Sequence, residues 1–233
     1  MKKITITQIS EKKIKAGNPL LQMEDFPNEL SFDEGELVEL VDSRQKFVAK
    51  AYLAKQNKGV GWVFSLDNAD SFNEAFFKKQ FEKAKRKRTD LQSDPETTTY
   101  RLFNAEGDGI PGVTIDHYDG FAVVSWYSEG IFRYQTAIIA AFQAVFPETK
   151  GIYEKFRYQR QDGLISRYVR GDAAPTPLIV KENGINYATY LDDGLMTGIF
   201  LDQRDVRGAL TERYAAGKRV LNTFSYTGAF SVA

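Results

Sequence analysis

Hydrophobic and polar residues alternate in several short segments of the first 70 residues. A period of two is typical of strands with one buried face, and a turn pattern such as Asp42-Ser43 separates two of these segments. We therefore predict a small β-barrel over residues 1–70. The segments that carry this prediction are Ile4–Ile6, Gly35–Asp42, Phe47–Leu53 and Gly59–Phe64.

A helical period follows in residues 71–95. Ser71 and Glu74 have the spacing of a capping box, which satisfies free N–H groups at the start of a helix. Pro95 is incompatible with a continuing helix. The pattern predicts one connector helix over residues 71–95, with an apolar face formed by Phe77, Phe81, Ala84 and Leu91.

Strand patterns return in residues 96–172, on both sides of one helical pattern. Ser128 is the expected cap of that helix, and Pro147 follows its last apolar position. We predict a compact α+β domain of two strands, a helix and two strands over residues 96–172. The strand patterns lie at Thr97–Phe103, Val113–Asp116, Phe121–Trp126, Ile152–Phe156 and Leu164–Val169.

A third pattern follows the proline-containing linker Gly171–Pro177. Asn183-Gly184 predicts a tight hairpin turn. Leu201–Tyr214 has helical spacing, Arg219–Asn222 is expected to be a short buried strand, and another helix begins after it. We predict that residues 178–233 are the N-terminal part of a Rossmann-like domain, so the fold class is α+β multidomain.

Composition excludes several kinds of site. The 233 residues contain no cysteine and a single histidine, His117. Disulfides, thiolate metal sites and a cysteine nucleophile are therefore absent from this sequence, and no metal site is expected. The N-terminus lacks the apolar run of a signal peptide, and no stretch of about 18 apolar residues occurs. We expect a cytoplasmic protein without a membrane partner.

Positive charge is concentrated locally, although the formal net charge is zero. A basic run on the connector helix suits contact with RNA phosphates, as do two arginines on later strands that alternate with aromatic residues. Solvated helix faces and alternating strands produce such patterns without RNA binding. The candidate RNA contacts are Lys78, Lys79, Lys83, Lys85, Arg86, Lys87, Arg88, Arg157 and Arg160.

Gly107–Gly112 matches the spacing G-x-G-x-x-G of a dinucleotide-binding loop. That loop must open a helix, whereas Pro111 here leads into the strand pattern at Val113. We interpret the segment as a connection between strands. We also interpret His117 as a structural residue, because a lone histidine forms neither a triad nor a metal site.

The segment Arg219–Val232 matches the strand, loop and helix that begin a class I methyltransferase. Asn222 takes the place of the usual acidic residue, and Gly228 is the one glycine retained in the loop. Backbone N–H groups at the start of the following helix suit the carboxylate of S-adenosylmethionine (SAM). A small residue at position 228 lets the backbone approach a ligand closely.

Two strings identify a family that the chain resembles. Thr197–Arg207 and Val220–Phe230 together resemble bacterial 5-methylcytosine methyltransferases of large-subunit ribosomal RNA, of the type that contains a PUA domain. The similarity extends to Gly107–Asp116 and to Gly35–Asp42. It implies an RNA-binding PUA barrel, a central domain that shapes a substrate groove, and a SAM-binding Rossmann-like domain.

The resemblance also implies roles for particular residues. SAM is the expected cofactor and 23S rRNA the expected partner. Arg207 is expected to contact RNA beside the cofactor. The implied cofactor-binding residues are Asp202, Gln203, Arg204, Asn222, Phe224, Ser225, Tyr226, Thr227, Gly228 and Phe230.

Members of this family attack C6 of cytosine with a cysteine, and an aspartate of a D-P-P string assists. Neither residue is in this sequence. We therefore expect the catalytic residues to lie beyond Ala233, and these 233 residues alone to be inactive. The alternatives are an RNA-binding module without catalysis, or a SAM-dependent enzyme acting on another base or on tRNA. A first Rossmann strand without parallel neighbours also predicts homodimer formation or disorder near residues 215–233.

Overall fold

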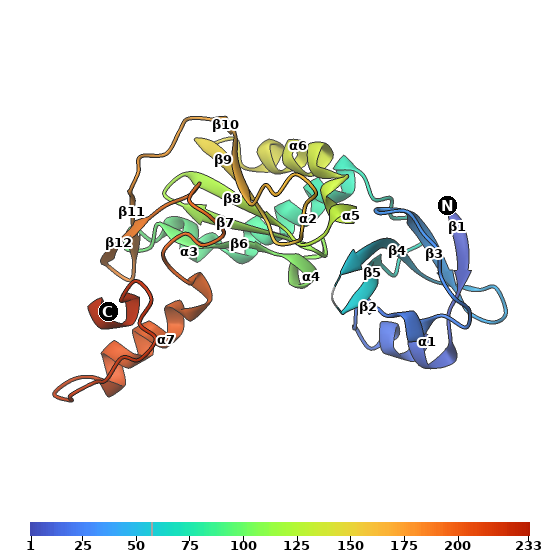
Figure 1. Ribbon diagram of the computed structural model, residues 1–233, viewed down its shortest axis with the longest axis horizontal. Coiled ribbons are helices and arrows are strands. Elements are labelled where there is room, and N and C mark those ends of the chain that lie inside the picture. Colours follow the sequence, from blue (N-terminus) through green and yellow to red (C-terminus); the bar gives the residue numbers. More distant parts are fainter. Residues whose placement is uncertain (57) are drawn as a thin grey trace.

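The computed structural model describes residues 1–56 and 58–233. The molecule is elongated, with the N-terminal barrel at one end, a five-stranded sheet in the middle and the C-terminal segments at the other end (Figure 1). No helix of the described residues is long and apolar enough to cross a membrane. These residues also contain no cluster of three or more acidic or histidine side chains that could hold a metal ion.

The N-terminal unit is a curved five-stranded sheet in the order β1-β3-β4-β5-β2. Its alternating residues close around a separate apolar cluster that includes Val38, Leu40 and Leu53. The four predicted strands are therefore confirmed, as β1 (Lys2–Thr5), β3 (Leu37–Val41), β4 (Phe47–Gln56) and β5 (Gly59–Ser65). The short edge strand β2 (Leu20–Leu21) was not predicted.

The barrel also contains a helix that the sequence analysis did not predict. Helix α1 (Gln8–Lys15) is capped by Thr7, whose hydroxyl accepts from the Ser10 N–H at 3.2 Å. Only Ser10 and Ile14 of this helix are buried. Two buried positions are too few to show a helical period, so the segment was missed. A short 3₁₀ turn, η1 (Met23–Asp25), follows.

The basic connector is two helices, and the prediction of one helix over residues 71–95 was wrong. Helix α2 (Glu74–Lys87) ends at Arg88, and α3 (Thr89–Ser93) follows. The Arg88 guanidinium turns back to the Ala84 carbonyl at 3.1 Å and to the Arg101 carbonyl at 2.7 Å. The predicted cap was also wrong, because the side chain of Asn73, not Ser71, accepts from the N–H of Phe76 at 3.1 Å.

The central sheet has the order β10-β9-β8-β7-β6, with β8 and β9 parallel. Three strands precede the helices, so the predicted arrangement of two strands, a helix and two strands was one strand short. The single predicted helix was also wrong, because the chain forms two helices, α5 and α6, in its place. The Ser128 cap is confirmed, since its hydroxyl accepts from Ile131 N–H at 3.3 Å. The elements are β6 (Thr99–Asn104), α4 (Ala105–Asp108), β7 (Val113–Tyr118), β8 (Phe121–Trp126), α5 (Glu129–Phe132), α6 (Gln135–Val145), β9 (Gly151–Phe156) and β10 (Ser166–Gly171).

The two faces of the central sheet differ in chemistry. Phe81 of α2 and Phe142 of α6 pack in one cluster with Ile115, Val124 and Trp126, so the helices cover an apolar face. Because side chains alternate across a strand, the residues between these apolar positions point to the other face. Strand register aligns three polar residues there, Thr114 opposite Ser125 and Ser125 opposite Lys155.

The barrel is fixed against the central domain by close backbone contact. A Cβ built on Gly130 would lie 2.5 Å from the Ala54 Cβ and 3.0 Å from the Gly35 N. Tyr134 donates to the Gly35 carbonyl at 2.6 Å, and Tyr52 donates to the Pro111 carbonyl at 3.0 Å. The two units therefore meet without space for an added methyl group.

The C-terminal part begins with the predicted hairpin, β11 (Leu178–Glu182) and β12 (Ile185–Thr189). Asn183 and Gly184 both have positive φ, as a two-residue type I′ turn requires. Instead of one helix over residues 201–214, the chain forms a 3₁₀ turn η2 (Leu201–Gln203), α7 (Arg204–Ala209) and a π turn η3 (Leu210–Tyr214).

The predicted buried strand Arg219–Asn222 does not form. Val220 and Leu221 are 57% and 86% exposed. A buried strand of this type needs parallel neighbours on which to pair, and no strand of the described residues pairs with this segment. The helix that follows it is α8 (Ala229–Val232).

Candidate cofactor loop and RNA groove

The two segments expected to bind a cofactor lie against one another. The Thr227 hydroxyl donates to the Gly198 carbonyl at 2.7 Å. The rings of Tyr226 and Phe200 are 5.4 Å apart. These contacts join the loop at residues 222–230 to the segment at residues 198–207, although the sequence separates them.

The loop itself has the backbone that a ligand-binding turn needs. Phe224, Tyr226 and Gly228 all have positive φ, and a Cβ added to Gly228 would meet no atom within 4 Å. Phe224, Ser225, Tyr226 and Thr227 are exposed, and the Asn222 amide donates to the Ser231 hydroxyl at 2.8 Å. Open backbone and exposed polar groups fit the methionine part of SAM, whose carboxylate needs N–H and hydroxyl donors.

The 3₁₀ turn η2 and the start of α7 place the other expected cofactor contacts. Asp202 is exposed and lines a small pocket under the central sheet. Gln203 and Arg204 are half-buried, and Arg204 forms an ion pair at 3.0 Å with its exposed neighbour Asp205. These side chains lie on the same segment that contacts the loop.

Arg207 does not have the position expected of an RNA contact. Its side chain is 2% exposed and makes two hydrogen bonds to Glu182, at 2.7 and 2.8 Å, and a third to the Phe200 carbonyl. The guanidinium also lies 5.4 Å from the ring centroid of Phe230. Arg207 therefore joins the hairpin, α7 and the loop, and its charge is neutralised inside the protein.

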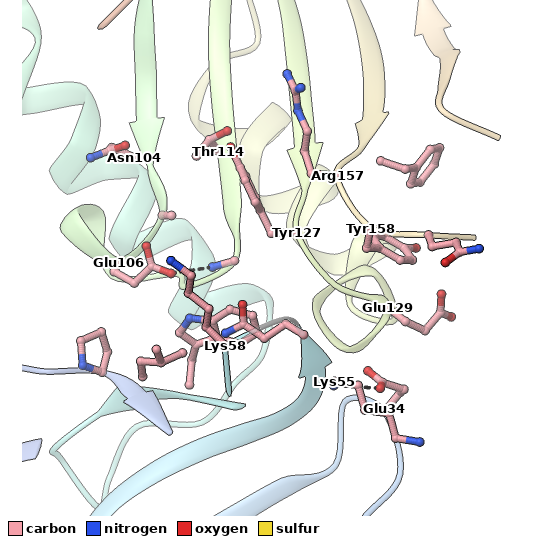
Figure 2. Close-up of a pocket in the computed structure, with 18 of the residues that line it drawn as sticks. Glu34, Lys55, Lys58, Asn104, Glu106, Thr114, Tyr127, Glu129, Arg157 and Tyr158 are labelled. Carbon is pink, nitrogen blue, oxygen red and sulfur yellow. Dashed lines mark hydrogen bonds between the residues drawn. The ribbon is translucent and has the colours of Figure 1, made fainter. Parts of the chain in front are cut away.

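A groove with a volume of about 1340 Å³ runs between the barrel and the central sheet (Figure 2). Lys55 and Lys58 line it from the barrel, and Tyr127 and Tyr158 from the central domain. The Glu34 carboxylate accepts from the Lys55 N–H at 2.9 Å. The Glu106 carboxylate accepts from the Gly112 N–H at 3.2 Å. The groove thus combines cations with aromatic rings, which suits an RNA strand.

A smaller pocket of about 150 Å³ lies further along the same sheet face. Arg101 and Arg157 line both the groove and this pocket, so they stand at the passage between them. In Figure 2 the Arg157 side chain extends along the sheet, away from the barrel. The other wall of the pocket is the segment Met196–Asp202, which leads into the cofactor residues.

One fully buried and two partly buried charged side chains line the pocket. Lys155 is fully buried and donates to the Gly194 carbonyl at 2.6 Å. Burial lowers the pKa of Lys155 to about 8. Asp116 accepts from two nitrogens of Arg101, one of them at 3.3 Å. Burial raises the pKa of Asp116, and Arg101 opposes part of that rise. Charged side chains thus line this pocket, whereas apolar side chains usually cover the buried face of a sheet.

Most cations of the basic helix are already engaged with the protein. Lys85 contacts the Val145 carbonyl at 2.8 Å and lies over the Phe146 ring. Lys87 and Arg88 both pair with the buried Asp108, at 2.9 and 2.6 Å. Lys79 pairs with Asp70, and Lys83 donates to Gln80. Lys78 and Arg86 are exposed. RNA contact by this helix stays a prediction, with these two the least engaged.

Arg157 and Arg160 have different surroundings, although both follow β9. Arg157 is exposed and faces the groove and the pocket. Arg160 lies 4.3 Å from the Phe156 ring centroid and pairs with Asp162 at 2.6 Å. Arg157 is therefore the better placed of the two for RNA.

The segment Gly107–Gly112 leads into β7, as expected of a connection between strands. His117 accepts from the Gly120 N–H at 3.2 Å and stacks on Tyr100, with ring centroids 5.0 Å apart. Burial lowers the pKa of His117 to about 4. The interpretation of this histidine as structural agrees with these contacts.

Sequence reasoning missed Arg101, Asp116 and Ser125 as site residues. The available signal was alternation in the strand patterns, because a polar residue between two buried apolar ones faces the opposite side of the sheet. The sequence alone did not show which strands contribute to that face, because this depends on the strand order.

Comparisons with known proteins support the N-terminal barrel and the C-terminal part that contains the candidate cofactor segments. Residues 4–66 match the family model of a PUA-like domain. Residues 133–233 match the model of S-adenosylmethionine-dependent methyltransferases. The second match covers α6, the end of the central sheet and both cofactor segments.

Two curated relatives have related names. The chain is 45% identical over 237 residues to the candidate ribosomal RNA large subunit methyltransferase YwbD of Bacillus subtilis, an alignment that covers 100% of this chain and 60% of YwbD. It is 36% identical over 202 residues to ribosomal RNA large subunit methyltransferase I of Cronobacter sakazakii, with 85% of this chain and 50% of that protein covered. The chain thus spans between half and two thirds of these relatives.

Two solved structures share the fold. One is a candidate SAM-dependent methyltransferase from Streptococcus mutans, and the other is a candidate methyltransferase complexed with SAH. Each has a TM-score of 0.92 and 46% identity, covering 99% of this chain and 59% of that chain. The fold class predicted from the sequence, a PUA-like barrel followed by α+β and methyltransferase parts, is confirmed.

Proposed function

We propose that this protein is a SAM-dependent methyltransferase that forms 5-methylcytosine in large-subunit ribosomal RNA. The observation that carries the proposal is the continuous path from the groove, past Arg101 and Arg157, to the cofactor segment at Asp202. A methyltransferase must bring its RNA and its cofactor to one place, and two pockets that share Arg101 and Arg157 support such an arrangement. The similarity to ribosomal RNA methyltransferases supports the choice of substrate.

SAM would be held by the loop at residues 222–230 and by Asp202, Gln203 and Arg204. When bound, SAM supplies an electrophilic methyl group. The chain's own residues would then act by position: Gly228 leaves the backbone accessible, Thr227 fixes the loop to Gly198, and the Arg207–Glu182 pair holds α7 under the loop.

RNA would lie in the groove between the barrel and the central sheet, with 23S rRNA the proposed partner and the cytoplasm the proposed location. Lys55, Lys58 and Arg157 would neutralise phosphates, and Tyr127 and Tyr158 would stack on bases. No cysteine occurs in the sequence. We therefore propose that methyl transfer by covalent attack on C6 needs residues outside these 233.

Nucleoside mass spectrometry of 23S rRNA tests the proposal. A strain that lacks the gene should lose one 5-methylcytidine, and the complete gene should restore it. Loss of a different modified base, or a change confined to tRNA, would instead favour a SAM-dependent enzyme that acts on another base or on tRNA. Unchanged RNA, combined with RNA binding by the purified protein, would favour a binding module without catalysis.

Homodimer formation also stays part of the proposal. Leu221 and Phe224 are exposed apolar side chains on one segment, at 86% and 103% of their reference areas. Exposed apolar surface of this kind favours association. Light scattering should give a mass above that of the monomer, and a monomeric mass would contradict dimer formation.

A further inference from the structure

One buried hydroxyl in the groove between the barrel and the central sheet has no partner. Thr114 of β7 is 5% exposed and lines the groove, and its hydroxyl makes no hydrogen bond among the described residues. A buried hydroxyl without a partner is unfavourable. Threonine has several staggered χ1 positions, so rotation about its Cα–Cβ bond can turn the hydroxyl toward a ligand. Thr114 therefore marks a place where the groove offers a hydrogen bond.

The backbone of Gly112 holds two further side chains near this hydroxyl. Its N–H donates to the Glu106 carboxylate at 3.2 Å, and its carbonyl accepts from the Tyr127 N–H at 3.0 Å. Gly112 lies two residues before Thr114, a distance of roughly 7 Å along an extended chain, and has no side chain to fill the space. Glu106, Thr114 and Tyr127 therefore line one stretch of the groove (Figure 2).

The Glu106 carboxylate differs in charge from the cations of the groove. Lys55, Lys58 and Arg157 line the same groove, whereas Glu106 is exposed and forms no ion pair within the described part of the chain. An ionised carboxylate only accepts hydrogen bonds, through two neighbouring oxygens. Because it repels a phosphate and attracts N–H donors, it suits the edge of a base rather than the RNA backbone.

One base matches this set of groups best. Guanine has two adjacent donors on its pairing edge, the ring N1–H and the N2 amino group, beside the O6 acceptor, whereas the other three RNA bases have one donor group there. The two donors match the two oxygens of the Glu106 carboxylate, and O6 matches a hydroxyl donor. The Tyr127 ring is 40% exposed, and exposed aromatic rings stack on unpaired bases.

We propose that Glu106, Thr114 and Tyr127 form a subsite for one unpaired guanine of the RNA. The base stacks on the Tyr127 ring, donates from N1 and N2 to the Glu106 carboxylate, and accepts at O6 from the Thr114 hydroxyl. These three residues line the groove and not the smaller pocket beside the cofactor segment, so the subsite reads a nucleotide that flanks the modified one. The inference rests on the proposed function and gives it a source of sequence preference.

Binding of short oligonucleotides tests the subsite without methyl transfer. The probes are fluorescent oligocytidylates whose central nucleotide is guanosine, inosine or adenosine, and anisotropy measures their affinity for the protein from its complete gene. Wild type should bind the guanosine probe roughly tenfold more tightly than the adenosine probe. Inosine lacks the N2 amino group, so its probe should bind with intermediate affinity. Glu106→Gln keeps an oxygen for the Gly112 N–H and should bind all three probes with similar affinity.

Thr114→Val separates a binding role of the hydroxyl from a structural one. Valine has nearly the same shape and lacks only the hydroxyl. The variant should lose part of the preference for guanosine, and its melting temperature should not fall, because the hydroxyl has no partner in the protein. A lower melting temperature with an unchanged preference would mean that the hydroxyl is structural and would overturn its place in the subsite.

Glu129→Gln is the matched control for charge, since Glu129 lines the same groove but lies beside Tyr158 (Figure 2). It should keep the wild-type preference for guanosine. Equal affinity of wild type for the guanosine and adenosine probes would overturn the inference, as would a full preference in Glu106→Gln or a loss of preference in Glu129→Gln. If wild type bound none of the probes, that result would contradict the RNA groove of the proposed function, and the inference with it.

Discussion

Arg207 and Glu182 form a two-bonded ion pair, at 2.7 and 2.8 Å, with both side chains almost fully buried. The pair joins the end of β11 to α7, and the Arg207 guanidinium also lies over Phe230 of the candidate cofactor loop. One interaction thus contacts the hairpin, the helix and the loop together. Its role is to fix the cofactor segment on the sheet.

Breaking this pair should destabilise the protein strongly. Arg207→Met leaves a buried carboxylate without a partner, which costs about 3–5 kcal/mol. Adding Glu182→Leu should recover most of that loss, because the charge is removed as well. Arg204→Met is the control, since the one ion pair of Arg204 among the described residues is with exposed Asp205, and its loss should change stability by about 0–1 kcal/mol. Urea unfolding measures all three; equal losses for Arg207→Met and Arg204→Met would refute the structural role.

The cap of α2 gives a second test. Asn73→Ala removes the acceptor of the Phe76 N–H and should cost about 1 kcal/mol. Ser71→Ala should cost less, because its hydroxyl makes no cap bond in this structure. Thermal unfolding of the two variants compares them directly. A larger loss for Ser71→Ala would restore the capping box that the sequence suggested.

The contact between barrel and central domain should be sensitive to one methyl group. Gly130→Ala places a Cβ 2.5 Å from that of Ala54, and such overpacking costs about 1–3 kcal/mol. Gly107→Ala is the control, because its nearest neighbour is the Asn104 side chain at 3.3 Å. Limited proteolysis should release the barrel faster from the first variant only. Equal rates of release from the two variants would mean that the added methyl group at position 130 does not weaken the contact.

His117 should make the protein sensitive to acid. Its pKa is about 4 when folded, below the ordinary value of 6.5, because burial disfavours the charged ring. The unfolded chain therefore binds the proton more readily between pH 6.5 and 4, and stability falls as the pH drops through that range. The melting temperature of His117→Gln should depend less on pH there than that of wild type. Parallel curves for the two proteins would exclude this histidine as the cause.

Local patterns predicted the elements that depend mainly on residues close to them in the sequence. Alternation located β3, β4 and β8, and the Ser128 signal located the start of α5, because each depends on neighbours within a few residues. The strand at residues 219–222 failed because its formation depends on partners that the described residues do not supply. The periodicity of a short segment does not indicate whether such pairing partners are present.

The candidate site divides in the same way. The loop around Gly228 and the segment at Asp202 could be found from their strings alone. Arg207 could not be assigned correctly, because its partner Glu182 lies on a distant hairpin. Ser125 and Lys155 could not be joined into one pocket before the parallel pairing of β8 and β9 placed them opposite one another.

The cofactor loop is the most direct test of the account as a whole. Gly228 and Gly163 both have positive φ, of 80° and 68°, and a Cβ on either would meet no atom within 4 Å. Valine is strained at both positions because each φ is positive, but only position 228 lies in the candidate loop. Calorimetric titration with SAH, using the protein from its complete gene, compares Gly228→Val, Gly163→Val and wild type. We expect binding by wild type and Gly163→Val and a loss of at least roughly tenfold for Gly228→Val, which corresponds to about 1.4 kcal/mol. Absence of SAH binding by wild type, or equal affinity for both variants, would contradict the proposal that this loop holds the cofactor.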